Sequence, residues 1–232
     1  TAEQALHQTS AAGYWSTFRG CLKVAYQEGI LQENVNEFLE PIAALTGRRE
    51  FLTLEEVRML ANTPCDVPDL KNASLFSCLT GLRISDILAL TWSNIVKAQD
   101  GGWCIRIRTE KTDTEATLPL TDEAYMLCGE HSEGLVFKNL KRYYTHEPLK
   151  EWVKAAGITK HITFHCFRHT FATLQVNEGT DIYTVSHLLT HANVGTTQIY
   201  ADIVDKSKRE AVERIKIMEE PKTAEKTEDN KE

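Results

Sequence analysis

Two short segments in which apolar and polar residues alternate are the feature that most constrains the fold of this chain. Residues 103–108 read Trp-Cys-Ile-Arg-Ile-Arg after an Asp-Gly-Gly turn, and residues 116–120 form a second short run. Such runs are typical of strands, and the short polar segment between them predicts an antiparallel pair with its tip at 110–114. The other apolar residues mostly recur at helical spacing. We therefore predict a mainly α-helical protein with a small antiparallel β-sheet, an α+β fold.

Capping residues and glycines divide the helical part of the chain. Thr53 and Glu56 have the spacing of a capping box, which marks the start of a helix. Glycines are frequent where helices end. The first predicted helix is 10–28, with Thr9 or Ser10 as its cap and Gly29 at its end. Two further helices are predicted at 70–79, before Gly81, and at 85–90. After Tyr125 the pattern is helical almost to the end of the chain, with stops at Gly157 and Gly179.

The segment 31–50 breaks the helical pattern with asparagines, Pro41 and Gly47, which predicts a linker. Beyond Pro221 the residues are charged and poor in apolar side chains, which predicts disorder. We therefore expect a helical region with its linker at 1–46, a larger domain at 47–218 and a charged tail at 219–232.

The composition limits the class of protein. The chain has 232 residues, 42% of them hydrophobic, which is enough for a large core. No apolar run approaches the ~18 residues of a membrane helix, and the first residues of the chain have no signal-peptide pattern. The six cysteines form no C-x-x-C pair, which indicates reduced thiols. We expect a soluble, cytoplasmic protein with no membrane partner, and an opening at Thr1 instead of Met suggests a piece of a longer protein.

The net charge is −7, which taken alone argues against a nucleic-acid partner. Residues 217–232 contain six acidic and three basic residues, which leaves −4 for the rest of the chain. Because a few arginines and lysines can gather at one site, the net charge does not exclude a nucleic-acid partner.

Five of the eight histidines lie between His161 and His191. His161, His165 and His169 stand four residues apart, so a helix could present all three to a metal ion. The chain has no H-E-x-x-H motif, and residues 162–163 look like the approach to a helix, which would leave His161 outside it. Core histidines are the structural alternative, and we expect no metal site and no cofactor.

A different set of residues has the chemistry to hold an anion. His165 and Arg168 are three residues apart, so one helix face can direct both to the same phosphate. An arginine binds two phosphate oxygens at once, and a neighbouring histidine donates to a third or moves a proton. A purely structural alternative is an arginine that pairs with a carboxylate while the histidine fills a gap.

Residues elsewhere in the chain add to this pair. Arg83 follows a helix stop, and Asp86 three residues later can orient it. Lys111 stands at the predicted hairpin tip, a mobile place for a proton donor, although most such lysines are only solvated. His191 precedes Tyr200 by nine residues.

The order of these residues resembles the tyrosine recombinase (phage integrase) family. In that family an arginine, a hairpin lysine, H-x-x-R, a histidine or tryptophan, and a tyrosine follow one another. The sequence segments around these residues also resemble those of the family: Thr-Gly-Leu-Arg at 80–83, His-Cys-Phe-Arg-His-Thr-Phe-Ala-Thr at 165–173 and Thr-Thr-Gln-Ile-Tyr at 196–200. The resemblance extends from Ser10 to about Ala211. It implies these catalytic residues: Arg83, Lys111, His165, Arg168, His191 and Tyr200 as nucleophile, with Asp86 and His169 supporting them.

Two features depart from the family pattern. The family usually has glycine before the second histidine, whereas this chain has Thr190, which fits without strain only if its φ is negative. The family's core-binding domain has about four helices, and residues 1–46 resemble only its last part.

The resemblance implies a reaction without metal or ATP. The reference pKa of a tyrosine phenol is about 10, so about one molecule in a thousand is ionised at pH 7 and the phenolate costs ~4 kcal/mol. Tyr200 would form a 3′-phosphotyrosyl link, and strands would exchange through a Holliday junction. His165 would take the tyrosine proton or bind the phosphate, and Lys111 would protonate the 5′ oxygen. This predicts a site-specific DNA recombinase.

The family also implies partners. These are double-stranded DNA, further copies of the chain in a homotetramer on that DNA, and an accessory DNA-bending or directionality factor. The protein itself would be associated with the bacterial nucleoid. The segment 205–218 would dock on a neighbouring protomer or pack on its own domain. Candidates for contacts with the DNA backbone are Arg48, Arg49, Lys71, Arg106, Arg108, Lys138, Lys141 and Arg142.

Three alternatives remain open at this point. A type IB topoisomerase-like enzyme would use the same chemistry to relax supercoils. An inactive DNA-binding relative would bind without cleavage, which a Tyr200→Phe variant of unchanged activity would favour. A metal-dependent helical protein would contain stoichiometric zinc.

Overall fold

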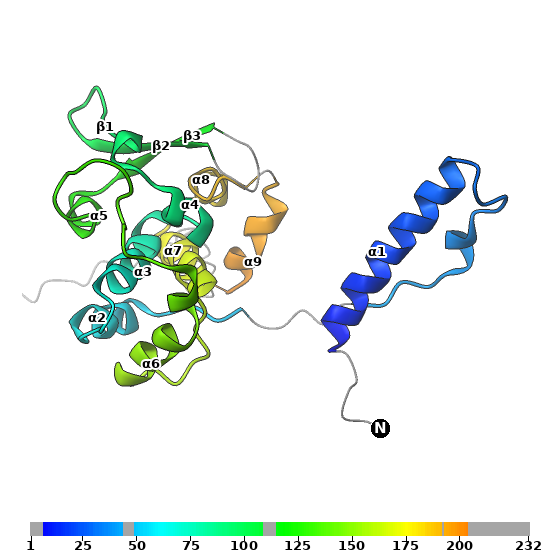
Figure 1. Ribbon diagram of the computed structural model, residues 1–232, viewed down its shortest axis with the longest axis horizontal. Coiled ribbons are helices and arrows are strands. Elements are labelled where there is room, and N and C mark those ends of the chain that lie inside the picture. The colour runs from blue at the N-terminus through cyan, green and yellow to red at the C-terminus, as the bar shows by residue number, and fades with distance from the viewer. Residues whose placement is uncertain (1–6, 44–48, 109–114, 192, 204–232) are drawn as a thin grey trace, which may run out of the picture. The chain divides into compact units, whose positions relative to one another are not determined.

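The protein is described by a computed structural model that covers residues 7–43, 49–108, 115–191 and 193–203 (Figure 1). Its contacts divide the chain into two units, Thr1–Arg49 and Glu50–Glu232. The predicted boundary at 46/47 and the predicted tail at 219–232 lie outside the described residues. In the part of the chain that is described, no helix is long and apolar enough to cross a membrane.

The first unit consists of α1 (Gln8–Gln27) and a 3₁₀ helix, Val35–Phe38. The predicted caps Thr9 and Ser10 are wrong, because the His7 imidazole accepts from the backbone N–H of Thr9 and starts the helix earlier. The segment 31–50, predicted to be a linker, contains this 3₁₀ helix, and its residues 44–48 lie outside the described residues.

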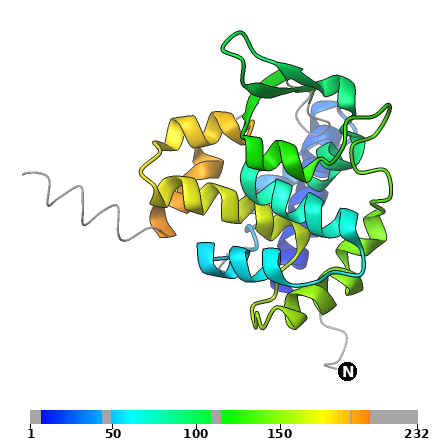
Figure 2. The ribbon, with the colours of Figure 1, turned by 90° about the vertical axis from the view of Figure 1, so that its left-hand side faces the viewer.

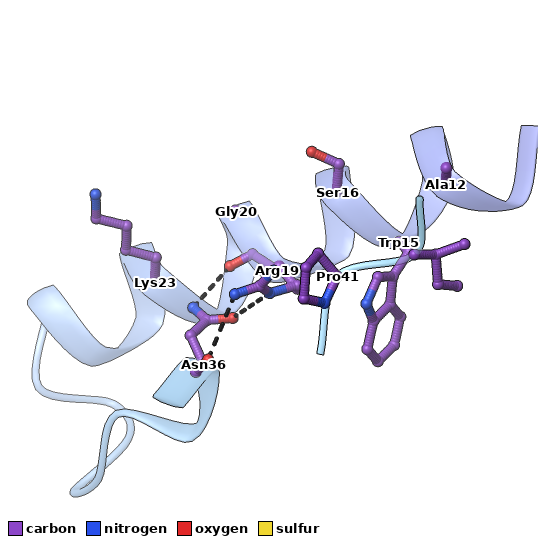
Figure 3. A pocket seen from close by; sticks show the side chains of 9 residues that line it. Ala12, Trp15, Ser16, Arg19, Gly20, Lys23, Asn36 and Pro41 are labelled. Atoms are coloured by element: carbon purple, nitrogen blue, oxygen red, sulfur yellow. Dashed lines mark hydrogen bonds between the residues drawn. The ribbon is translucent and has the colours of Figure 1, made fainter. Parts of the chain in front are cut away.

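Hydrogen bonds explain why this segment folds back on α1 (Figure 3). The Asn36 side chain donates to the carbonyl of Arg19 at 2.9 Å and accepts from Arg19 Nε at 3.4 Å. Trp15 Nε1 donates to the carbonyl of Glu40 at 2.8 Å. Tyr14 and Phe18, on the predicted apolar face, stay 68% and 51% exposed, because the one short element that returns here covers a different side of the helix.

The second unit is mainly helical with one three-stranded sheet, which confirms the predicted fold class. Its helices are α2 (Leu54–Asn62), α3 (Pro68–Thr80), α4 (Ile84–Ala89), α5 (Asp122–Leu127), α6 (Glu147–Ala155), α7 (Phe164–Asn177), α8 (Ile182–Leu188) and α9 (Gly195–Ile203). Its strands are β1 (Ile95–Lys97), β2 (Trp103–Arg108) and β3 (Glu115–Leu120). Short 3₁₀ helices lie at Trp92–Asn94 and Arg142–Thr145.

The sheet has the order β1-β2-β3 with antiparallel pairing. The predicted pair is confirmed, with Trp103 opposite Leu120 and Arg106 opposite Thr117. The sequence did not predict β1, because three residues are too few to display an alternating pattern. The predicted tip at 110–114 lies outside the described residues.

Several helix boundaries agree with the predictions. The capping box of Thr53 and Glu56 is confirmed, and so is the end of α3 at Gly81. The helical prediction for 128–141 is wrong. Gly129 and Gly134 both have positive φ there, and Val136 donates its backbone N–H to the carbonyl of Leu90, so this segment pairs with extended chain instead.

The helices α3 and α7 form the centre of the second unit, with Phe76 and Phe167 fully buried on them. The sheet lies at one edge, and α2 and α6 lie at the opposite edge (Figures 1 and 2). Thr170 Oγ1 on α7 accepts from the backbone N–H of Leu52 at 2.9 Å, which ties α7 to the start of the unit. A second apolar cluster joins α7, α8 and α9 and includes Phe171, Leu189 and Tyr200.

Replacement of Gly81 by alanine is expected to destabilise the unit strongly. Gly81 has φ +71°, and an added Cβ would lie 2.6 Å from Phe171 Cδ1 and 2.8 Å from Leu189 Cδ2. The positive φ costs about 1–2 kcal/mol and the overpacking about 1–3 kcal/mol more. Gly101→Ala is the matched control, because φ is +85° there with nothing within 4 Å. Thermal unfolding should show a clearly larger loss for Gly81→Ala, and equal losses would contradict the packing argument.

Candidate active site

Arg168 is the most deeply buried charged residue of the candidate site. Its side chain extends from α7, and Nη1 donates to the carbonyl of Gly81 at 2.6 Å while Nη2 donates to the carbonyl of Leu189. These carbonyls lie at the C-terminal ends of α3 and α8. The guanidinium therefore holds three helices together through backbone atoms.

Burial, and to a smaller extent the positive charge of Arg83, lower the pKa of Arg168 to about 10. Interactions with Tyr200 and Asp86 act in the opposite direction. A pKa near 10 leaves the guanidinium charged at neutral pH. Because the two carbonyls take two of its five N–H donors, the others remain for an anion.

Arg83 lies at the N-terminal cap of α4, close to Arg168. Its backbone N–H donates to Asp86 Oδ2 at 3.4 Å, and its Nη1 lies 4.0 Å from the same oxygen. The Asp86 carboxylate is buried, so it can orient the Arg83 side chain from within the protein interior. Nη1 also donates to Thr190 Oγ1 at 3.5 Å.

Tyr200 lies on α9 with 1% of its surface exposed. Its hydroxyl is 2.7 Å from Nδ1 of His169, which is also buried. The rings of His165 and His169 meet edge to face at 4.5 Å, one helical turn apart on α7. His165 itself is exposed. The tyrosine hydroxyl is thus in contact with His169, to which the sequence assigned only a supporting role.

The turn after α8 brings the second histidine into the site. The N–H of Thr190 donates to the carbonyl of His187 and that of His191 to the carbonyl of Ser186, which is the Schellman pattern. Thr190 adopts φ +52°, so the condition for a strain-free fit is not met. For a β-branched residue this conformation costs about 1–2 kcal/mol. His191 Nδ1 lies 2.7 Å from Thr197 Oγ1, which fixes the orientation of the ring.

The structure thus gathers most of the predicted site residues around Arg168 and Tyr200. They are Arg83, Asp86, His165, Arg168, His169, His191 and Tyr200. Lys111 and the segment 205–218 lie outside the described residues. The sequence did not point to Thr197 or to the carbonyls of Gly81 and Leu189, because backbone partners leave no trace in residue identity.

No group of three or more His, Cys, Asp or Glu side chains is arranged to hold a metal ion within the described ranges. Helix α7 begins at Phe164, so the expectation that His161 lies outside it is confirmed. The three histidines at four-residue spacing therefore do not share one helix.

The basic residues predicted to contact DNA have different environments. Arg106 and Arg108 are exposed, lie two residues apart on β2 and line a hollow of about 500 Å³. Arg49, Lys138, Lys141 and Arg142 are exposed as well. Lys71 donates to the carbonyl of Thr63 at 3.0 Å, so its ammonium group is engaged within the protein. Arg48 lies outside the described residues.

Comparisons with known proteins identify the family of this chain. Residues 50–207 match the model of the phage integrase family. The chain belongs to this family. A tyrosine recombinase of Thermosipho africanus is 28% identical over 219 residues, which cover 90% of this chain and 76% of that protein. The tyrosine recombinase XerD of Corynebacterium glutamicum is 31% identical over 232 residues, which cover 90% of this chain and 75% of the relative.

The fold is also similar to that of a lambda integrase fragment, residues 75–356, solved as a dimer bound to a COC′ core site. The TM-score is 0.70 at 21% identity, and the match covers 86% of this chain and 75% of that one. Membership of the phage integrase family supports a DNA cleavage-and-rejoining enzyme at the level of the family.

The two arginines should differ in their contribution to stability. Arg168→Lys leaves at least one of two buried carbonyls without its donor, which costs about 1–3 kcal/mol, whereas Arg83→Lys loses only longer contacts on a side chain that is 14% exposed. Urea unfolding should therefore show a clearly larger loss for Arg168→Lys. Equal losses would mean that the Arg168 hydrogen bonds do not support the fold.

Proposed function

We propose that this protein is a site-specific DNA recombinase in which Tyr200 attacks a DNA phosphate. The observation that carries the proposal is the hydroxyl of Tyr200, held at 2.7 Å by a histidine beside the buried, charged guanidinium of Arg168. A charged arginine next to a nucleophile suits a substrate that is itself an anion. A phosphodiester has two non-bridging oxygens, which a guanidinium group can bind together.

In the proposed reaction Arg83 and Arg168 bind the non-bridging oxygens of the scissile phosphate, with His191 and the exposed His165 as further donors. Preorganised donors that meet charge developing in the transition state are typically worth ~3–4 kcal/mol each. The support for this role is that each side chain has a partner within the protein. Arg83 lies near Asp86, and Arg168 donates to two helix-terminal carbonyls. His191 contacts Thr197.

The proton of Tyr200 passes to Nδ1 of His169, a side-chain base that lies 2.7 Å from its hydroxyl. The tyrosine oxygen then forms a bond to phosphorus while the bond from phosphorus to the 5′ oxygen breaks. Lys111 gives a proton to that oxygen, as the family pattern implies. The result is a 3′-phosphotyrosyl link and a free 5′ hydroxyl, with no other reactant required.

A 5′ hydroxyl from a second duplex reverses the step and exchanges strands through a Holliday junction. Two duplexes need four protomers, and the segment 205–218 is the proposed contact between them. The lambda integrase fragment whose fold is similar was solved on a core site. The exposed Arg106 and Arg108 are candidates for contacts with the DNA backbone, together with Arg48, Arg49, Lys141 and Arg142. An accessory DNA-bending or directionality factor completes the proposed assembly.

The first test uses nicked DNA that carries the cognate core site. In the presence of EDTA, the wild-type protein should form a covalent complex with DNA that survives denaturing electrophoresis, and Tyr200→Phe should form none. Tyr200→Phe should still bind the site, as measured by gel shift. A covalent complex with Tyr200→Phe would contradict the assignment of the nucleophile. Relaxation of supercoils without strand exchange would favour the topoisomerase-like alternative, and binding without cleavage an inactive relative.

The second test separates proton transfer from positioning. In His169→Asn the amide oxygen takes the place of Nδ1 and accepts the hydrogen bond of Tyr200, but it is not a base. We expect cleavage to slow by about 10²-fold or more and to recover in part at higher pH, since general bases typically contribute 10²–10⁴-fold. His165→Asn is the matched control one turn away, expected to keep the pH dependence of the wild type. Wild-type rates in His169→Asn would contradict the role of His169.

A further inference from the structure

Thr190 is the one non-glycine residue with positive φ in the part of the chain that the structure describes. It occupies the left-handed position of the turn that ends α8, where glycine would fit without strain. A β-branched side chain is among the least suited to this conformation. An unfavourable residue at such a position points to a contact made by its side chain.

The side chain of Thr190 makes two polar contacts. Oγ1 donates its proton to the carbonyl of Leu189 at 2.6 Å and accepts from Arg83 Nη1 at 3.5 Å. The same Leu189 carbonyl accepts from Arg168. The directions of these bonds are consistent, because one hydroxyl donates once and accepts from an arginine. They form a continuous path from Arg83 through Thr190 and Leu189 to Arg168.

The contact matters because Arg83 is otherwise held at longer range. Its guanidinium lies 4.0 Å from the Asp86 carboxylate, beyond hydrogen-bond distance, whereas the Thr190 hydroxyl is at 3.5 Å. Arg168 is fixed by two carbonyls, but Arg83 has no comparable support from the backbone in the described contacts. Without the hydroxyl, the position of Arg83 relative to Arg168 would be less well defined.

We propose that Thr190 is a positioning residue, whose hydroxyl holds the guanidinium of Arg83 at a fixed position relative to that of Arg168 so that both arginines bind one phosphate. This inference rests on the proposed function, because it assigns both arginines to the same anion. It also gives a reason for the strained turn: the conformation directs Oγ1 to Arg83, and glycine would remove the strain together with the contact.

Three substitutions separate strain from hydrogen bonding. Thr190→Val keeps the β-branch and loses the hydroxyl, Thr190→Ser keeps the hydroxyl, and Thr190→Gly loses both hydroxyl and strain. With saturating nicked DNA, the single-turnover cleavage rate should fall about 10-fold in Thr190→Val and in Thr190→Gly, since small misplacements of reacting groups are costly. The rate of Thr190→Ser should stay within about 2-fold of the wild type. Of the three variants, only Thr190→Gly should raise the midpoint of thermal unfolding.

If Thr190 had only a structural role, Thr190→Gly would make the protein more stable and would not slow the reaction. A cleavage rate of Thr190→Gly equal to or above that of the wild type therefore overturns the proposal. Equal rates for Thr190→Ser and Thr190→Val overturn it as well. In an Arg83→Lys background Thr190→Val should have little further effect, because the arginine contact is already lost.

A measurement without DNA keeps this inference separate from the proposed function. The ¹⁵N NMR signals of the Arg83 guanidinium report how freely the group rotates. We expect slower rotation in the wild type than in Thr190→Val, and equal mobility in both would overturn the proposal whether or not the protein cleaves DNA. The absence of a covalent complex with wild-type protein, together with restricted Arg83, would refute the proposed function alone.

Discussion

The buried guanidinium of Arg168 is the interaction on which the rest of the site depends. A charge that is 98% removed from solvent is tolerated only with strong hydrogen-bond partners. Here the partners are carbonyls at the ends of α3 and α8, where the helix dipoles place partial negative charge. The same contacts fix the turn that carries His191. One side chain thus sets both the packing of α7 against its neighbours and the position of the proposed phosphate site.

This arrangement explains how a chain with net charge −7 can hold an anion site. The relevant charges are local, because two arginines lie close enough for Arg83 to lower the pKa of Arg168. Their mutual repulsion costs free energy in the absence of a ligand. In the proposed complex, a phosphate between the two arginines would remove that cost and so contribute to binding.

The outcome of the sequence predictions follows from which interactions are local. The β2–β3 pair, the capping box at Thr53 and the stop at Gly81 depend on neighbours within a few residues, and they were predicted correctly. The grouping of the site residues came from the resemblance to a family. The contact of His169 with Tyr200 joins residues 31 positions apart, and the partners of Arg168 are backbone carbonyls, so neither has a sequence pattern. The extended segment at 128–141 is held by pairing with Leu90, which is equally invisible in its own sequence.

The burial of Tyr200 has a consequence for the proposed reaction. With 1% of its surface exposed and its hydroxyl bound to His169, the proposed nucleophile is buried in this structure. In the proposed reaction Tyr200 gives its proton to His169 and then has to reach a DNA phosphate, so we expect α9 to shift against α7 and α8 and to separate Tyr200 from the apolar cluster that includes Phe171 and Leu189. The free energy of that packing would then be part of the cleavage barrier. Contacts that stabilise α9 in this position would slow cleavage, and contacts that draw it toward DNA would speed it, without any change in the arginines that bind the phosphate.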